Sequence, residues 1–188
     1  MSPKFWWYTT RSSGIVAWSL AATSVIFGLL LSTRSARGLA KPVWVLDLHR
    51  YLGALTLAAV GVHLGALVAD TFVPFGWADL FVPGASAWRT TPVALGVIAF
   101  WLFLAVEVSS LARKKLSNRV WARIHLLSFV AYVLATLHYI QAGTERTNPL
   151  LLLVVEAASA IVLGLTILRI LVPRRSRGRA VRPASAAQ

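Results

Sequence analysis

Five long apolar stretches, separated by short segments that hold most of the charged residues, form the main pattern of this chain. A membrane-spanning helix needs about 20 predominantly apolar residues. Each stretch has about that length, and none alternates apolar and polar residues as a half-buried β-strand does. We therefore predict an all-α integral membrane bundle. Its five transmembrane helices are expected at about 14–31, 43–68, 92–111, 120–140 and 149–171.

Lysine and arginine predict the orientation of these helices. They are concentrated in the first and third loops and in the C-terminal segment, whereas the second and fourth loops carry only Arg89 and Arg146. Cytoplasmic loops of membrane proteins are enriched in lysine and arginine. We therefore expect the N-terminus outside and the C-terminus inside, although Lys4 and Arg11 precede the first span. The expected location is the plasma (inner) membrane, with several crossings.

Three segments are expected along the chain. Residues 1–13 hold four consecutive aromatics and are predicted to form an interfacial segment, since aromatic side chains favour the headgroup region. Residues 14–172 form the transmembrane domain. Residues 173–188 are rich in arginine, proline, serine and alanine, and are predicted to form a basic disordered tail held to anionic lipid.

Composition excludes several classes of protein. The chain is 57% hydrophobic and 13% charged, whereas a soluble domain is about 45–50% apolar and about 25% charged. The net charge of +13 lies in loops and tail, so membrane lipid is the expected partner, and no soluble basic fold for nucleic acid is present. Cysteine is absent, which excludes disulfides, thiol catalysis and iron–sulfur clusters on this chain.

All four histidines lie in the second and fourth predicted spans. His49 and His63 are 14 residues apart, and His125 and His138 are 13 apart. The two spans run in the same direction, and at about 1.5 Å per residue the paired histidines are separated by about 21 Å and about 20 Å. We therefore expect His49 and His125 at one depth, near the cytoplasmic face, and the other two near the outer face.

The 13-residue spacing predicts that His125 and His138 lie on different faces of an ideal α-helix. Fourteen residues return to almost the same face of an α-helix, whereas 13 residues leave His138 about 140° from the face of His125. Either the fourth span is overwound or kinked, or its rings use different rotamers, or the two sites lie on different sides of this helix.

Facing histidine pairs favour haem over other chemistry. Imidazole is an axial ligand of haem iron, and two histidines on facing helices fill both axial positions, leaving a centre that passes single electrons. Pairs about 20 Å apart cannot form one zinc site, which needs converging ligands. A proton relay usually has acidic partners along its path. The alternative without a cofactor is a set of histidines that bond to neighbouring helices.

Small and aromatic residues beside the histidines have two interpretations. Gly53 and Thr56 lie on the stripe between His49 and His63, where they allow a flat porphyrin to approach or serve plain helix–helix contact. Tyr132 lies on the face of His125, where it either fills the gap between two haems or is a core aromatic.

Charged residues near the spans also have two interpretations. Arg50 and Arg123 lie beside the inner pair and Arg89 is near the outer pair, so each either binds a haem propionate or is a snorkelling charge that sets topology. Glu107 and Glu156 are the acidic residues well inside spans. Each either handles protons or a quinol hydroxyl, or is a paired or snorkelled carboxylate.

The segments LDLHRYLGALTLAAVGVH and RIHLLSFVAYVLATLHY, two helices apart, resemble the ferric reductase-like transmembrane domain. NADPH oxidases, ferric reductases and the haem-binding membrane subunit of the bacterial methionine sulfoxide reductase system share this domain. The resemblance implies two haem b groups, one held by His49 and His125 and the other by His63 and His138. It also implies outward electron flow. The chain differs from the eukaryotic members in having five predicted spans instead of six and no fused flavin or nicotinamide domain.

The leading hypothesis is therefore a transmembrane di-haem cytochrome, an oxidoreductase or its electron-transfer subunit, with no catalytic residue assigned. We expect a donor outside this chain on the cytoplasmic side, either a separate flavin reductase or quinol. The acceptor would be extracytoplasmic: ferric iron, oxygen or a protein. One alternative is a quinol-oxidising cytochrome b subunit. Another is a non-haem transporter or scaffold.

Overall fold

The computed structural model describes residues 4–33, 35, 41–144 and 147–171, and the regular secondary structure of this part of the chain is all helical, with no strand. Five long helices carry the fold, and two short helical pieces lie in the connections. In chain order the elements are α1 (Lys4–Thr33), α2 (Pro42–Ala69), α3 (Trp77–Phe81), α4 (Thr90–Leu111), the 3₁₀ turn η1 (Arg113–Lys115), α5 (Asn118–Ala142) and α6 (Pro149–Leu171).

The five long helices are each long and apolar enough to cross a membrane, which confirms the predicted helical membrane bundle. The first begins earlier than expected, because α1 starts at Lys4. Most of the segment predicted to be interfacial therefore continues α1. The hydroxyls of Thr9, Ser12 and Ser13 donate to carbonyls one turn back, so these polar residues are accommodated within the helix. The predicted tail lies outside the described residues.

Local sequence signals mark several helix starts. Pro42 and Pro149 are the first residues of α2 and α6, where the missing N–H of proline is tolerated. The Ser117 side chain accepts a hydrogen bond from the Val120 N–H at 3.3 Å and so caps α5. Arg89, which precedes α4, has a φ of 44°, in the left-handed region that few residues other than glycine adopt.

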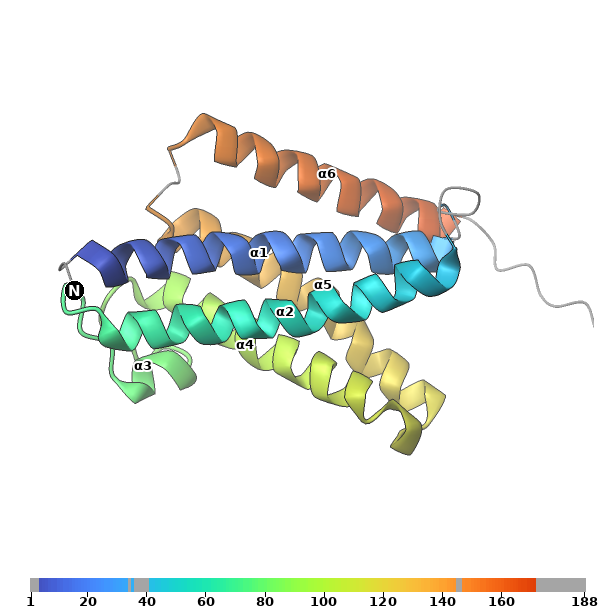
Figure 1. The fold of residues 1–188 in the computed structure, drawn as a ribbon, viewed down its shortest axis with the longest axis horizontal. Coiled ribbons are helices and arrows are strands. Elements are labelled where there is room, and N and C mark those ends of the chain that lie inside the picture. The colour runs from blue at the N-terminus through green and yellow to red at the C-terminus, as the bar shows by residue number, and fades with distance from the viewer. Residues whose placement is uncertain (1–3, 34, 36–40, 145–146, 172–188) are drawn as a thin grey trace, which may run out of the picture.

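The long helices form two antiparallel pairs, and the fifth helix packs on one of them. Helix α1 lies along α2, α4 lies along α5, and α6 lies along the other side of α1 (Figure 1). The described core lies between α1, α5 and α6, and its buried members are Trp18, Ala22, Val25, Leu29, Tyr132, Val155 and Val162.

Trp18 fastens α1 to α5. Its indole Nε1 donates to Thr136 Oγ1 at 3.0 Å, and its ring stacks on Tyr139 with the ring centres 5.4 Å apart. An aromatic ring with a satisfied N–H is a strong contact between helices in apolar surroundings. This contact holds the first helix against the helix that carries His125 and His138.

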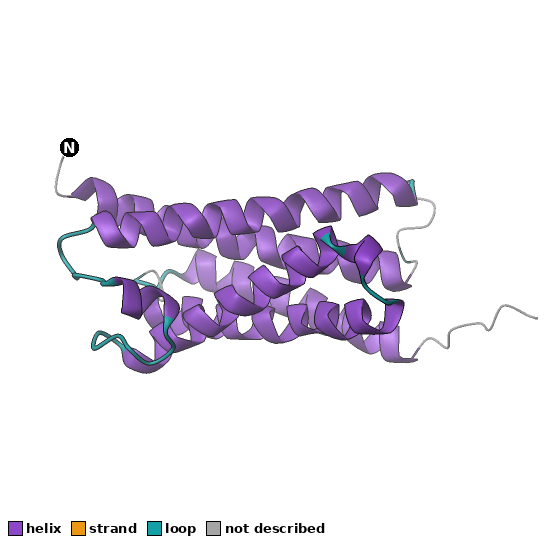
Figure 2. Cartoon of the chain, turned by 90° about the horizontal axis from the view of Figure 1, so that it is seen from below, coloured by secondary structure: helices purple, strands orange, loops and turns teal. Residues whose placement is uncertain are grey.

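Successive long helices run in opposite directions, so the bundle has two distinct ends (Figure 2). One end holds the start of α1, the end of α2, α3 and the end of α5, and we call it the His63 end. The opposite end holds the starts of α2 and α5 with η1, and we call it the His49 end. Helices α2 and α5 are therefore co-directional, as predicted.

Candidate cofactor site: two facing histidine pairs

The four histidines meet as two pairs across α2 and α5. The ring centres of His49 and His125 are 5.9 Å apart, and those of His63 and His138 are 6.5 Å apart. The ring planes are nearly perpendicular, at 76° and 81°. The depth matching predicted from the 14- and 13-residue spacings therefore places the expected partners together, one pair at each end of the bundle.

The 13-residue spacing does not require a break in the helix. Helix α5 is an uninterrupted α-helix over Asn118–Ala142, so neither a kink nor a change of helix type rotates His138 toward its partner. Helix α5 instead runs obliquely to α2 in Figure 1. Because the two helices cross, the histidine pairs lie on different sides of α5, which was one of the three predicted solutions.

Three of the four imidazoles are held by the backbone of a neighbouring helix. The Nδ1 of His49 lies 2.9 Å from the Ser24 carbonyl oxygen, and that of His63 lies 2.8 Å from the Thr10 carbonyl oxygen, both on α1. The Nδ1 of His138 lies 2.7 Å from the Pro92 carbonyl oxygen on α4. A carbonyl oxygen only accepts, so in each case Nδ1 carries the proton and donates it.

These hydrogen bonds leave the other ring nitrogen, Nε2, unprotonated. No described hydrogen bond uses the Nε2 of any histidine. Metal-bound histidines typically donate the second ring N–H to a backbone carbonyl, which fixes the ring orientation and increases its basicity as a ligand. Both rings of the His63–His138 pair, and the His49 ring of the other pair, therefore have an unprotonated Nε2.

A glycine lies under each of the three imidazoles that a carbonyl holds. A Cβ on Gly14 or on Gly28 would stand 3.1 Å from an atom of His63 or His49, and a Cβ on Gly96 would stand 2.7 Å from His138 Nδ1. Each glycine follows the accepting carbonyl by four residues on the same helix, as in the pair Pro92 and Gly96. A side chain at these positions would crowd the ring that approaches the carbonyl, most severely at Gly96.

His125 is placed differently. Its Nδ1 is buried and has no hydrogen-bond partner among the described residues. Its ring instead stacks on Trp121, with ring centres 4.8 Å apart and planes 22° apart, and the Arg113 guanidinium lies 4.5 Å from the centre of the Trp121 ring. The fourth imidazole is therefore held by an aromatic contact from its own helix.

The pairs fit a metal held between two axial imidazoles. Two metal–nitrogen bonds of about 2 Å each, with about 1 Å from each nitrogen to its ring centre, place the ring centres about 6 Å apart. The separations of 5.9 and 6.5 Å bracket this value. In the described ranges, no group of three or more His, Cys, Asp or Glu side chains converges on a metal site. Two facing imidazoles alone would suit a metal whose other ligands come from a macrocycle.

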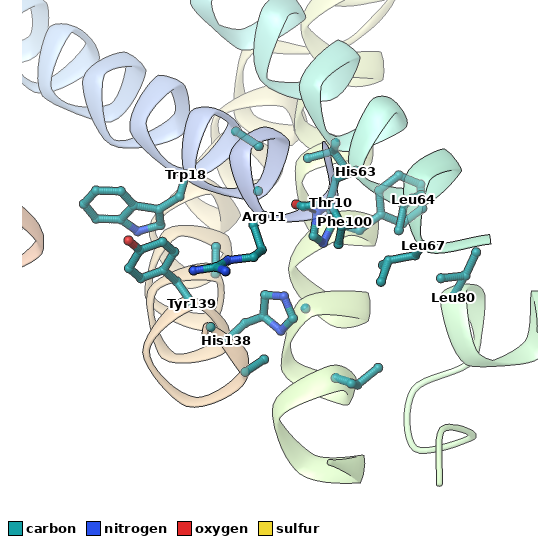
Figure 3. Close-up of a pocket in the computed structure, with 18 of the residues that line it drawn as sticks. Thr10, Arg11, Trp18, His63, Leu64, Leu67, Leu80, Phe100, His138 and Tyr139 are labelled. Carbon is teal, nitrogen blue, oxygen red and sulfur yellow. Dashed lines mark hydrogen bonds between the residues drawn. The ribbon is translucent and has the colours of Figure 1, made fainter. Parts of the chain in front are cut away.

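An apolar cavity of about 290 Å³ opens at the His63 end. His63 and His138 line it together with Thr10, Thr56 and Arg11, and Figure 3 shows Arg11 reaching from α1 toward His138 and Tyr139. The Thr10 Oγ1 is buried without a partner in the described part of the chain. Apolar walls with a cation and an unused hydroxyl beside two imidazoles match the needs of a porphyrin with charged propionates.

Arg11 was not predicted to be a site residue, because its charge was interpreted only as evidence for the orientation of the first helix. The Arg11 guanidinium also lies 4.0 Å from the centre of the Trp7 ring. Its position seven residues before Trp18 places it on the same face of α1, and this spacing is the signal in the sequence that indicates its inward direction.

Gly53, Thr56 and Tyr132, which were predicted beside the histidines, lie in three different environments. Gly53 lies against α4, because a Cβ there would stand 2.8 Å from a carboxylate oxygen of Glu107. Thr56 is buried in the cavity wall and donates to the Leu52 carbonyl. Tyr132 packs in the core between α1, α5 and α6, where its hydroxyl lies 3.2 Å from Ser159 Oγ. Core packing therefore accounts for the burial of Tyr132.

The three predicted arginines lie at the expected ends. Arg50 is exposed at the His49 end, where its guanidinium is 3.8 Å from the Asp47 carboxylate, and Arg123 is exposed near the start of α5. Arg89 donates to the Gln141 carbonyl at 2.7 Å, which joins the start of α4 to the end of α5 beside His138.

Glu156 lies on the exposed side of α6.

A membrane helix bundle with two facing histidine pairs agrees with the resemblance to the ferric reductase-like transmembrane domain. The family described as ferric reductase like transmembrane component matches residues 13–136. The match includes three of the four histidines and ends two residues before His138. The chain therefore belongs to this family, and it is a multi-pass membrane protein.

One curated relative is the protein-methionine-sulfoxide reductase heme-binding subunit MsrQ of Cronobacter sakazakii. It is 26% identical over 121 residues, which cover 63% of this chain and 58% of that protein. The chain thus matches somewhat more than half the length of this relative. No solved structure matches the chain.

Proposed function

We propose that this protein is a transmembrane di-haem b cytochrome that carries electrons between the two faces of the membrane. One haem is held by His49 and His125 and the other by His63 and His138. The observation that supports this most is the pairing of four imidazoles at 5.9 and 6.5 Å. In three of them, Nδ1 donates its proton to a backbone carbonyl, which leaves Nε2 unprotonated.

When bound, haem would supply one-electron redox chemistry, and the paired histidines would be the residues that hold it. The chain's own residues bind and orient it. Backbone carbonyls of α1 and α4 hold the ring planes of three ligands, and apolar walls at the His63 end exclude water. Arg11 and Arg89 place positive charge at that end, where propionates need it. Arg50 and Arg123 serve the opposite end.

The charge distribution supports an orientation with the N-terminus outside and the C-terminus inside. The described His49 end carries the basic turn η1 with Arg119 and Arg123, whereas the described His63 end carries Asp70 and Asp79 beside Lys4, Arg11 and Arg89. By the excess of lysine and arginine in cytoplasmic loops, the His49 pair is the inner pair. Electrons then enter at His49 and His125 and leave at His63 and His138.

The donor is proposed to be a separate flavin reductase or membrane quinol on the cytoplasmic side. The acceptor is outside the membrane and is ferric iron, oxygen or a protein. The name of the relative describes a haem-binding subunit of a methionine sulfoxide reductase, and this supports a protein acceptor, with the chain acting as an electron-transfer subunit.

A vesicle experiment tests transmembrane electron transfer directly. The purified protein is reconstituted with haem into liposomes that contain ferricyanide, and a membrane-impermeant reductant is added outside. We expect ferricyanide inside to be reduced by vesicles with the wild-type chain, and His63→Ala to abolish this reduction while leaving the remaining haem reducible. Equal rates in protein-free vesicles and wild-type vesicles would contradict the proposal. A purified chain with no Soret band would favour a scaffold or transporter.

A further inference from the structure

The three held imidazoles share one structural unit, which we call the carbonyl–glycine seat: a carbonyl at position i and a glycine at i+4 of a neighbouring helix. The seats are Thr10 with Gly14, Ser24 with Gly28, and Pro92 with Gly96. The two seats on α1 are 14 residues apart, the same separation as their partners His49 and His63 on α2. The two seats on α1 therefore have the same spacing as the two histidines of α2 that they hold.

The glycine in each seat has a direct physical reason. In an α-helix the N–H of residue i+4 already donates to the carbonyl of residue i. A carbonyl oxygen has a second lone pair, and a side chain at i+4 would cover it. Glycine leaves that lone pair open to an imidazole from the next helix. The seat therefore supplies both a hydrogen bond and room for the ring.

His125 has no such seat. Its Nδ1 is buried and has no hydrogen-bond partner among the described residues, so no described carbonyl of a neighbouring helix holds the ring. Its described ring contacts are with His49 and Trp121, whose ring centres lie 5.9 and 4.8 Å away.

The contact that holds His125 does not replace the missing hydrogen bond. Trp121 stacks on the face of the ring and makes no hydrogen bond to Nδ1. Hydrogen bonds to the second nitrogen of a histidine ligand commonly contribute about 10–100-fold to metal affinity. His125 is thus the one ligand of the four without this contribution in the described structure.

We propose that His125 is the exchangeable axial ligand, and that the iron between His49 and His125 is where a small neutral ligand such as carbon monoxide binds. This inference rests on the proposed function, because it needs both haems. With haem bound, the added ligand would take the place of the His125 imidazole, which would be released unchanged, and no electron would be gained or lost.

The wild-type protein, reduced by dithionite and titrated with carbon monoxide, tests the inference. The number of haems per chain is measured first. We expect one of two haems to bind carbon monoxide at least about 10-fold more tightly than the other. We also expect Trp121→Leu to increase affinity at that haem, because the stacking contact is lost. Two bound haems that both exclude carbon monoxide, or that bind it equally, would overturn the inference while leaving the proposed function intact. Absence of haem would overturn both.

A variant at the seat of His138 gives the second test. Gly96→Ser places a side chain against the His138 imidazole and so removes its seat, and we therefore expect a second carbon monoxide site to appear at the His63 end. Gly61→Ser is the matched control, because a Cβ at Gly61 meets nothing within 4 Å. The inference fails if Gly96→Ser, with two haems bound, leaves carbon monoxide binding as in the wild type. It also fails if Gly61→Ser changes binding equally.

Discussion

The imidazole of His138 lies directly on Gly96, so that a Cβ at position 96 would stand 2.7 Å from Nδ1 and 2.8 Å from Cε1. Because real Cβ atoms do not approach so closely, Gly96→Ala must displace the ring from the Pro92 carbonyl. We expect affinity for the haem at the His63 end to fall about 10–100-fold, measured as haem retained per chain during dilution. Gly14→Ala should have a smaller effect, since its closest ring atom is 3.1 Å away.

The control for this series is Gly61→Ala on α2, where the added methyl group meets nothing within 4 Å. It should retain haem as the wild type does. If Gly96→Ala retained haem equally well, the seat would have no role in holding the ligand.

The pairing of His63 with His138 predicts how haem is lost when one ligand is removed. His63→Ala should remove one haem of two and leave the other reducible by dithionite, because His49 and His125 are at the opposite end of the bundle. His138→Ala should give the same spectrum as His63→Ala, and His49→Ala should remove the other haem. Reduced-minus-oxidised spectra check this. Different spectra for His63→Ala and His138→Ala would show that these two residues do not share a haem.

The near-perpendicular ring planes, at 76° and 81°, predict a magnetic signature. Perpendicular axial imidazoles leave two iron orbitals close in energy, so ferric low-spin haem becomes strongly anisotropic. We expect the low-temperature electron paramagnetic resonance spectrum of the oxidised protein to show two signals with large maximal g-values. Two ordinary rhombic signals would indicate parallel ring planes and contradict the orientation set by the seats.

The hydrogen bond from Trp18 to Thr136 predicts a measurable coupling between α1 and α5. Trp18→Phe keeps an aromatic ring and removes the donor, and Thr136→Val removes the acceptor. Hydrogen bonds between membrane helices contribute about 0.6 kcal/mol on average and up to about 1.7 kcal/mol. A double-mutant cycle on the free energy of unfolding in detergent should give a coupling in this range. Purely additive effects would show that the contact contributes nothing.

The distribution of basic residues predicts the topology. A reporter that is active only in the cytoplasm should be active when fused after the C-terminus, and an extracytoplasmic reporter should be active in the loop near Asp79. The opposite result for both reporters would reverse the proposed direction of electron flow, without affecting the histidine pairs.

The sequence predicts the helices and the histidine pairs because both depend on spacing along single helices. Apolar length defines the spans, and residue separation defines the depth of each imidazole. The direction of His138 did not follow from spacing, because it depends on the angle at which α5 crosses α2, which no local pattern encodes. The start of α1 was also missed, because its polar hydroxyls bond to the helix backbone.

The carbonyl–glycine seats could not be predicted from residue types, since a backbone carbonyl is the same in Thr10, Ser24 and Pro92. One signal was present: Gly14 and Gly28 have the spacing of His49 and His63. Its meaning depends on the register between α1 and α2, which only the structure supplies. For Tyr132 the sequence left two interpretations open, a cofactor contact or a core aromatic, and in the structure it packs against α1 and α6.

Pyridine-haem quantitation of the purified chain, read together with its Soret band, tests the central claim most directly. The account predicts two haem b groups per chain in the wild type and one in His63→Ala and in His49→Ala. A wild-type chain that is folded, has been expressed with ample haem and contains none would contradict the account.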